Sequence, residues 1–326
     1  MKPLLRIGVT AGFAAALVMA GPHTAAQAEA WPSKPIRMIV SSGAGGGLDL
    51  AARLVAAPIA EALKQNVVVD NRPGASGSIA AELIAQAAPD GYTFMVLSAS
   101  LVVYGVANKT RYDLYRDFDA VSQIAASPYI LTVTPSLPVK SVAELIAYAK
   151  ANPSKLNFAS TGPASLAHLA GELFGITTGT QLVHVPYRGV GAALPDMISG
   201  RTQMSFLSGG SVSAQIRNES LKPLAVAGTA RAKSMPNVPT MAETGVPGFV
   251  VTQWHGVVTP RGTPRAIIER MHQEIAKAVQ RPEVASRLAQ DGTEGVGSSP
   301  KEFAAFLKSE RDQWAKVAKA ANIRSK

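Results

Sequence analysis

Two glycine-rich turns are the segments of this sequence whose residue types could bind a small anion. The first is Ser42-Gly43-Ala44-Gly45-Gly46-Gly47-Leu48-Asp49 and the second is Ser160-Thr161-Gly162-Pro163-Ala164-Ser165. Each follows a short apolar run and precedes a helix-like segment, so free N–H groups and the positive end of the helix dipole face whatever lies before the turn. Glycine permits the φ > 0 conformations and close backbone approach that this requires. The pattern predicts an anion held between two halves of the chain.

The elements that must position these turns alternate between strand-like and helix-like segments. Strands are expected at 36–40 and 156–159, directly before the two turns. Helices are expected at 48–64 and 165–175, and each begins within the last residues of its turn. Short connections between alternating elements are typical of an α/β protein with mostly parallel sheets. We therefore expect two mostly parallel sheets flanked by helices.

Two extended, proline-closed segments, 128–135 and 250–260, are the expected crossings between the two halves. If both are hinge strands, residues 31–131 and 251–326 form one lobe. Residues 132–250 then form the second lobe.

The N-terminus has the three parts of a secretory signal peptide. Lys2 and Arg6 are basic, an apolar run follows at 7–20, and small residues before Ala28 and before Ala30 fit a cleavage site after either alanine. The sequence has no cysteine, so it offers no lipoprotein attachment site, disulfide or thiolate metal site. We expect residues 1–30 to be a signal peptide and the mature protein to be periplasmic.

Composition and motifs argue against several other functions. The formal net charge is +10, but the basic residues are dispersed, which argues against nucleic-acid binding. His168 and Glu172 share a helical face but supply only half of a metal site. The first turn lacks the Gly-Lys-Ser/Thr ending of a P-loop. We expect no metal and no cofactor.

An exported hydrolase is an alternative that these residues leave open. Gly-x-Ser-x-Gly and His-Glu-x-x-His are both absent. Ser165 and His168 could in principle be a nucleophile and a base, but they would lie one turn apart on one helix with no evident orienting acid. We expect a binding protein, not an enzyme.

Ordered motifs along the chain resemble the Bug family, the periplasmic substrate-binding proteins of tripartite tricarboxylate transporters. They are Trp31-Pro32-Ser33-Lys34-Pro35, Asp70-Asn71-Arg72-Pro73-Gly74, Pro89-Asp90-Gly91-Tyr92, His168-Leu169-Ala170-Gly171-Glu172, His184-Val185-Pro186-Tyr187-Arg188-Gly189 and Pro239-Thr240-Met241-Ala242-Glu243. The resemblance implies a two-lobed, type II-like periplasmic-binding-protein fold that closes on an organic carboxylate. It also implies delivery to membrane permease subunits; a ligand-sensing role for a signalling partner would use the same fold. We expect a monomer.

The resemblance also assigns ligand positions. They map onto the first turn (Ser42, Gly43, Ala44, Gly45, Gly46 and Asp49), the second turn (Ser160, Thr161, Gly162 and Ser165), and Ser98, Tyr187, Asp196, Leu207 and Ser208. An aspartate after a glycine turn can instead tie down the turn itself, and Tyr187 and Trp254 can either line a cleft or belong to the core.

Several positions depart from the usual family pattern. Ser42 replaces an aromatic residue, and Leu48, Leu166 and Leu207 stand where relatives often carry polar or acidic residues. From these departures we expect a carboxylate with an apolar or aromatic body.

Overall fold

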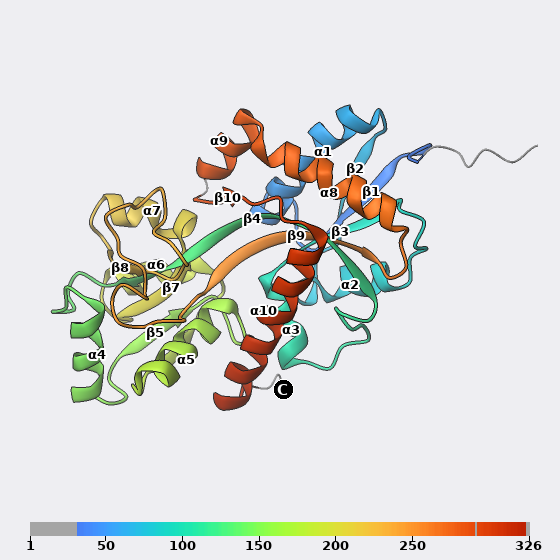
Figure 1. Cartoon of the computed structure of the whole chain (residues 1–326). Helices are drawn as coiled ribbons and strands as arrows, with labels where there is room; N and C mark the ends of the chain where they lie inside the picture. The colour runs from blue at the N-terminus through green and yellow to red at the C-terminus, as the bar shows by residue number, and fades with distance from the viewer. Residues whose placement is uncertain (1–30, 291, 324–326) are drawn as a thin grey trace, which may run out of the picture. The chain divides into compact units, whose positions relative to one another are not determined.

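Strand β4 (Phe118–Val133) connects the two halves of the β-structure in the computed structural model of this protein (Figure 1). Up to Pro128 it pairs with β9 (Thr252–Pro260), and Ala125 and Ala126 also pair with β10 (Glu294–Gly295). From Tyr129 onward it pairs with β7 (Met204–Ser208) and β8 (Lys222–Val226). The structure describes residues 31–290 and 292–323, so the expected signal peptide, residues 1–30, lies outside the described residues.

The remaining strands form a parallel group in each half. β1 (Ile36–Val40) lies between β2 (Val67–Asn71) and β3 (Thr93–Ser98), and β5 (Asn157–Ser160) lies between β6 (Val183–Pro186) and β7. β9 is antiparallel to both β3 and β4, and β4 is antiparallel to β7. The α/β class is confirmed, but the strands form one mixed sheet in the order β2-β1-β3-β9-β4-β7-β5-β6, whereas two mostly parallel sheets were expected.

The register along β4 places the carboxyl ends of the two parallel groups opposite each other. Ser98, the last residue of β3, pairs with His255, which in turn pairs with Ala125 of β4. Ser208, the last residue of β7, pairs with Tyr129 of β4. Positions 125 and 129 are roughly 13 Å apart at about 3.3 Å per residue. Because β4 is antiparallel to β7 and β9 is antiparallel to both β3 and β4, the turns that follow β1 and β5 begin at facing edges.

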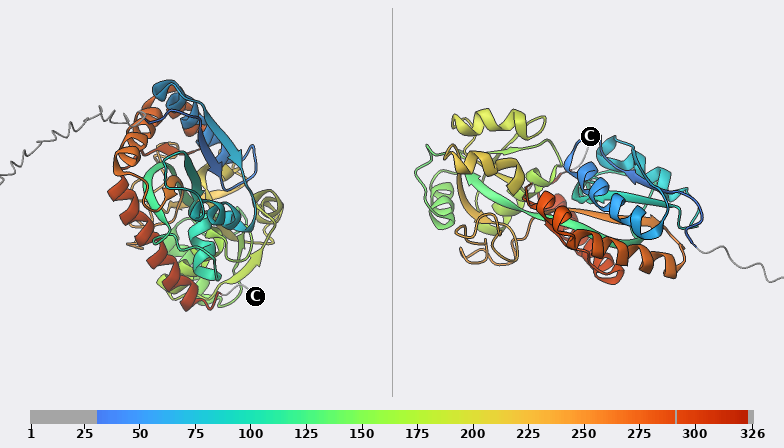
Figure 2. Two further views of the ribbon diagram at one scale, coloured as in Figure 1. Left: turned by 90° about the vertical axis from the view of Figure 1, so that its right-hand side faces the viewer. Right: turned by 90° about the horizontal axis from the view of Figure 1, so that it is seen from above.

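Helices cover both faces of the first half. Met38 and Phe94 pack with helices α1, α8 and α9, whereas the alternating residues Ile39 and Met95 pack with α2, α3 and α10. Figure 2 shows α8, in orange, beside α1, in blue, and α10, in red, lies against α3. The helices are α1 (Gly47–Leu63), the 3-10 helix η1 (Ala75–Gly77), α2 (Ser78–Ala85), α3 (Ala99–Ala107), α4 (Val142–Ala151), α5 (Leu166–Thr178), α6 (Val190–Ile198), α7 (Gly209–Arg217), α8 (Arg265–Gln280), α9 (Pro282–Gln290) and α10 (Pro300–Ala320).

Local sequence explains where several helices begin. Ser299 and Glu302 form a capping box at the start of α10, with Pro300 at its first position. The Ser141 hydroxyl accepts the Glu144 N–H at 3.2 Å at the start of α4, and the Glu144 carboxylate accepts the Lys140 N–H. Over residues 31–290 and 292–323, no helix combines the length and the apolar character needed to span a membrane.

Candidate functional site

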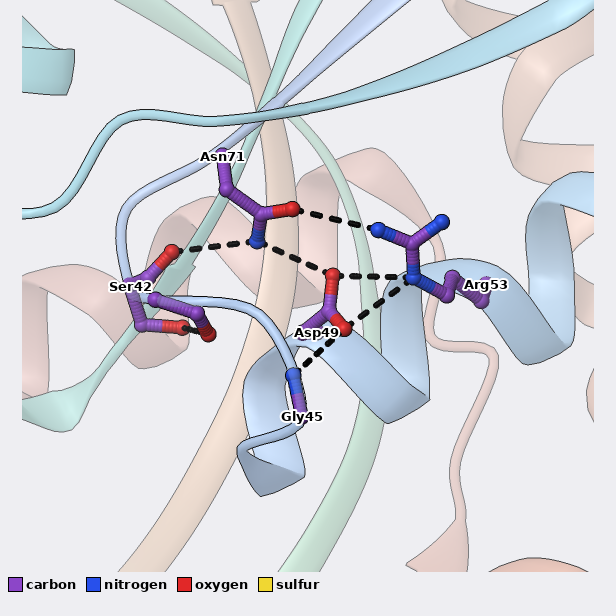
Figure 3. A network of polar contacts seen from close by, with 6 residues as sticks. Ser42, Gly45, Asp49, Arg53 and Asn71 are labelled. Atoms are coloured by element: carbon purple, nitrogen blue, oxygen red, sulfur yellow. Dashed lines mark hydrogen bonds and ion pairs between the residues drawn. The ribbon is translucent and has the colours of Figure 1, made fainter.

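The first turn is held in shape by a network around Asp49 (Figure 3). The Asp49 carboxylate accepts hydrogen bonds from the Gly45 N–H at 2.9 Å, from Arg53 Nε at 3.0 Å and from Asn71 Nδ2 at 2.9 Å. The same Asn71 amide donates to the Ser42 carbonyl at 3.1 Å. The side chain of Asp49 therefore makes its hydrogen bonds on the inner side of the turn and joins Gly45 to the start of α1.

Electrostatics keep Asp49 ionised. Asp49 is only 3% exposed, and burial alone would raise the pKa of its carboxyl. The hydrogen bond from Arg53 outweighs that effect, and with the Gly45 N–H and the Asn71 amide it lowers the pKa of Asp49 to about 2. A fixed carboxylate here explains how a turn so rich in glycine keeps one conformation.

Outside this network the turn presents backbone to open space. Residues 43–47 are exposed, and no heavy atom lies within 4 Å of where a Cβ on Gly43 or Gly45 would stand. Gly45 has φ +82°, a conformation that favours glycine. Gly46 is the N-cap of α1 and makes no side-chain cap hydrogen bond, so the first N–H groups of α1 have neither an intrahelical partner nor that cap. This arrangement suits an anion.

The second turn is tied by hydroxyl and imidazole groups. Ser160 Oγ accepts the Gly162 N–H at 3.1 Å and lies 2.6 Å from His184 Nε2. Ser165 is the N-cap of α5, and its hydroxyl accepts the His168 N–H at 3.2 Å. Gly162 has φ +134° and Thr161 is half-buried. As at the first turn, polar side chains fix the backbone at the start of a helix.

Tyr187 and Asp196 are paired beside the second turn. The Tyr187 N–H donates to the Ser160 carbonyl at 3.0 Å, and its hydroxyl donates to Asp196 at 2.7 Å. Arg201 donates to the other Asp196 oxygen at 2.9 Å. The Tyr187 hydroxyl and the Arg201 guanidinium hold the pKa of Asp196 below its ordinary value. Both Asp196 oxygens are thus engaged within this half of the protein.

Ser98 and Ser208 stand at the facing strand ends. Ser98 is the N-cap of α3 and is 9% exposed, and Ser208 is the N-cap of α7, with its hydroxyl 2.7 Å from that of Ser211. Neither helix has a side-chain cap hydrogen bond from these residues. Both serines therefore lie at the same two facing edges as the turns.

The three leucines differ from the expectation, and Trp254 belongs to the core, which is one of its two expected places. Leu207 is 1% exposed because both faces of β7 are covered, so it packs in the core and presents no surface to a ligand. Leu48 and Leu166, at 7% and 3% exposed, are also core residues. Trp254 is fully buried and donates to Glu310 at 2.7 Å. These three leucines therefore give no support to a ligand with an apolar body.

The structure brings the predicted residues together as two groups. Ser42 to Asp49 and Ser98 lie at one edge, and Ser160 to Ser165, Tyr187, Asp196 and Ser208 lie at the other. Among residues 31–290 and 292–323, no hydrogen bond or ion pair joins the two groups, and no cluster of three or more metal-ligating side chains occurs. Arg53, Asn71 and His184 also shape the turns and were not predicted from the sequence, although parallel pairing of β1 with β2 places Asn71 beside Val40, at the start of the first turn.

Comparison with known proteins identifies the class of protein. A family model described as the tripartite tricarboxylate transporter family receptor matches residues 51–323. A UPF0065 protein from the tcbD-tcbE intergenic region of Pseudomonas sp. (strain P51) is 38% identical, covering 93% of this chain and 91% of that protein. Protein BugT of Bordetella pertussis is 34% identical, covering 95% and 96%.

Two solved structures are similar over nearly the whole chain. Rpa4515 of R. palustris with adipate is 35% identical with a TM-score of 0.75, covering 90% of this chain and 99% of that one. MatC of Rhodopseudomonas palustris with bound malate is 29% identical with a TM-score of 0.72, covering 88% and 99%. The fold and these comparisons define a periplasmic-binding-protein-like receptor, a class of binding proteins and not of enzymes. The chain belongs to the tripartite tricarboxylate transporter receptor family, which includes the Bug proteins.

Proposed function

We propose that this protein binds an organic carboxylate in the periplasm and presents it to the permease subunits of a tripartite tricarboxylate transporter. The observation that carries the proposal is the similarity, over 90% and 88% of this chain, to two proteins solved with adipate and with malate, at 35% and 29% identity. The two glycine-rich turns at facing strand ends supply the chemistry, because helix N-termini and free N–H groups favour anions.

Binding would couple to closure of two lobes. We assign residues 31–131 and 251–326 to one lobe and 132–250 to the other, with β4 and β9 as the strands between them. A carboxylate that contacts both turns stabilises the closed form, so affinity and closure are one equilibrium. Ser42, Gly43, Ala44, Gly45 and Gly46 would contact it from one lobe, and Thr161, Gly162 and Ser208 from the other.

The two relatives, and not the leucines, support the class of ligand that we propose. Adipate and malate both carry two carboxylates, so we propose an aliphatic dicarboxylate as the ligand to test first. The ligand would be released unchanged, since the receptor would perform no chemistry on it.

A thermal-shift screen tests this proposal. Ligand-stripped protein is heated with adipate, malate, citrate, glutamate and an aromatic monocarboxylate, and with the diamide of adipic acid as the matched uncharged control. A ligand at 100 times its Kd adds about 2.7 kcal/mol to the unfolding free energy, so an acid that binds raises Tm and the diamide does not. Equal shifts with acid and diamide, or no shift with any acid, would count against carboxylate binding.

Export would precede this function. We propose cleavage of the signal peptide after Ala28 or Ala30, so that the mature monomer begins at Glu29 or Trp31. Intact-mass measurement of protein from a periplasmic extract distinguishes the two sites. Recovery of the full chain from the membrane fraction would contradict both.

A further inference from the structure

Two histidine side chains hold the two sides of the second turn. His184 Nε2, on β6, lies 2.6 Å from Ser160 Oγ, which in turn accepts the Gly162 N–H at 3.1 Å. His168 Nδ1, on α5, accepts the Ala164 N–H at 3.0 Å. Each imidazole therefore restrains one end of the segment from Gly162 to Ala164.

The two imidazoles are held as one unit. Their rings are parallel within 7° and their centroids are 3.6 Å apart, and the Phe158 ring extends the stack at 5.0 Å from His184. A Cβ on Gly171 would stand 2.2 Å from a Phe158 ring atom, so a glycine is needed for Phe158 to occupy its place. Residues from β5, β6 and α5 thus fix the position of the acceptor nitrogen on His168.

The turn needs this acceptor because its backbone is strained. Ala164 has φ +53°, a left-handed conformation that costs a non-glycine residue free energy unless its surroundings enforce it. The nitrogen that accepts the Ala164 N–H must be unprotonated, so the proton of neutral His168 is on Nε2, which faces Glu172 Oε1 at 3.5 Å. Glu172 thereby favours the tautomer that the turn requires.

We propose that His168 is a positioning residue for ligand binding: its Nδ1 holds Ala164 in the left-handed conformation and so aims the second turn at the ligand carboxylate. The effect on affinity rests on the proposed function, whereas the effect on the turn does not. His168 itself touches no ligand in this account, because it lies behind the turn and is 9% exposed.

Two substitutions at His168 separate the effect of the hydrogen-bond acceptor from the effect of the stacked ring. In His168→Asn the side-chain oxygen can stand near the position of Nδ1, so the acceptor is kept and the ring stack is lost. In His168→Phe the ring stack with His184 and Phe158 is kept and the acceptor is lost. His272→Asn, on α8, is the matched control, because the buried Nδ1 of His272 has no hydrogen-bond partner in the described part of the chain.

The readouts are amide hydrogen exchange at Ala164 without ligand, Tm, and Kd for adipate and malate by calorimetry. We expect exchange at Ala164 to be about tenfold faster in His168→Phe, the size of one lost hydrogen bond, and within about threefold of wild type in His168→Asn. Kd should rise more in His168→Phe than in His168→Asn, whereas Tm should fall more in His168→Asn. His272→Asn should leave exchange and Kd unchanged.

Wild-type exchange at Ala164 in His168→Phe would overturn the proposal, and so would wild-type Kd in that variant. A loss of affinity in His168→Asn greater than in His168→Phe would do the same, because affinity would then follow the ring. If wild-type protein binds neither acid, the proposed function fails for these ligands, and exchange at Ala164 alone decides the role of His168.

Discussion

Trp254 and Glu310 form a buried hydrogen bond between β9 and α10, with the indole Nε1 2.7 Å from Glu310 Oε2. Trp314 donates to the same oxygen at 3.2 Å. Burial raises the pKa of Glu310, and the two indole N–H groups counter that rise only in part. One carboxylate oxygen thus satisfies two buried tryptophans at the strand that crosses between the halves.

Glu310→Gln should be tolerated and Glu310→Ala should not. Glutamine keeps an acceptor for both indoles and removes a buried charge, so we expect its unfolding free energy to stay within about 1 kcal/mol of wild type. Alanine leaves two buried N–H groups unpaired and should cost about 2 to 4 kcal/mol. Urea unfolding at neutral pH measures both, and equal losses would show that the acceptor is unimportant.

Asp49→Asn should weaken the first turn and reduce its acid sensitivity. The pKa of Asp49 falls from 3.8 to about 2 on folding, equivalent to about 2 kcal/mol of stability. Because the folded-state pKa is the lower one, this stability is present above about pH 4 and is lost as the pH falls toward 2. We expect the variant to lose about 1 to 2 kcal/mol at pH 7 and to show a shallower decline in acid.

The matched control for Asp49 is another Arg–carboxylate pair with i,i+4 spacing. Glu269 lies 3.7 Å from Arg265 on α8 and both side chains are exposed, so Glu269→Gln should change stability by less than about 0.5 kcal/mol. Urea unfolding across a pH series compares the two. A loss in Glu269→Gln as large as that in Asp49→Asn would contradict the role of the network.

His255 should make the protein sensitive to mild acid. It is 9% exposed, its Nδ1 lacks a partner among the described residues, and burial lowers its pKa from 6.5 to about 4. The folded state then binds fewer protons than the unfolded state, so stability falls by up to about 3 kcal/mol as the pH drops from 6.5 to 4. In His255→Phe the loss of stability between pH 6.5 and pH 4 should be smaller than in wild type, and urea unfolding midpoints at the two pH values measure it. An equal loss in the variant would show that another group causes the acid sensitivity.

Gly45→Val and Gly162→Val should each abolish ligand binding. Both glycines have positive φ, +82° and +134°, and a Cβ at either would strain the turn or enter the space in front of it. Gly248→Val, with φ +75° and open space around it, imposes a similar backbone cost away from both turns. Calorimetry should find binding in Gly248→Val alone, and retained affinity in both turn variants would place the site elsewhere.

The sequence was informative where a feature depends on neighbouring residues. The two turns follow β1 and β5 and open onto α1 and α5, as predicted. Helices α3 and α7 were not predicted, because each begins at the residue after a strand. α3 is apolar on most sides, and α7 begins with two glycines, which are unfavourable in a helix.

Features that depend on distant segments were harder to predict. The family resemblance assigned Leu207 to the site, and the residues next to it in the sequence do not reveal that it is buried in the core. The sheet is mixed because β4 and β9 lie between the two parallel groups and run antiparallel to their neighbours. The sequence of a single segment does not show which strands it pairs with. The contacts of Asp49 with Asn71, and of Ser160 with His184, join residues on different strands or helices.

A crystal structure of the protein with the acid that raises Tm most would test the central claim most directly. We expect carboxylate oxygens within about 3.2 Å of backbone N–H groups, or of waters bound to them, from both the 42–49 turn and the 160–165 turn. A ligand held by one turn alone, or bound away from both, would contradict it.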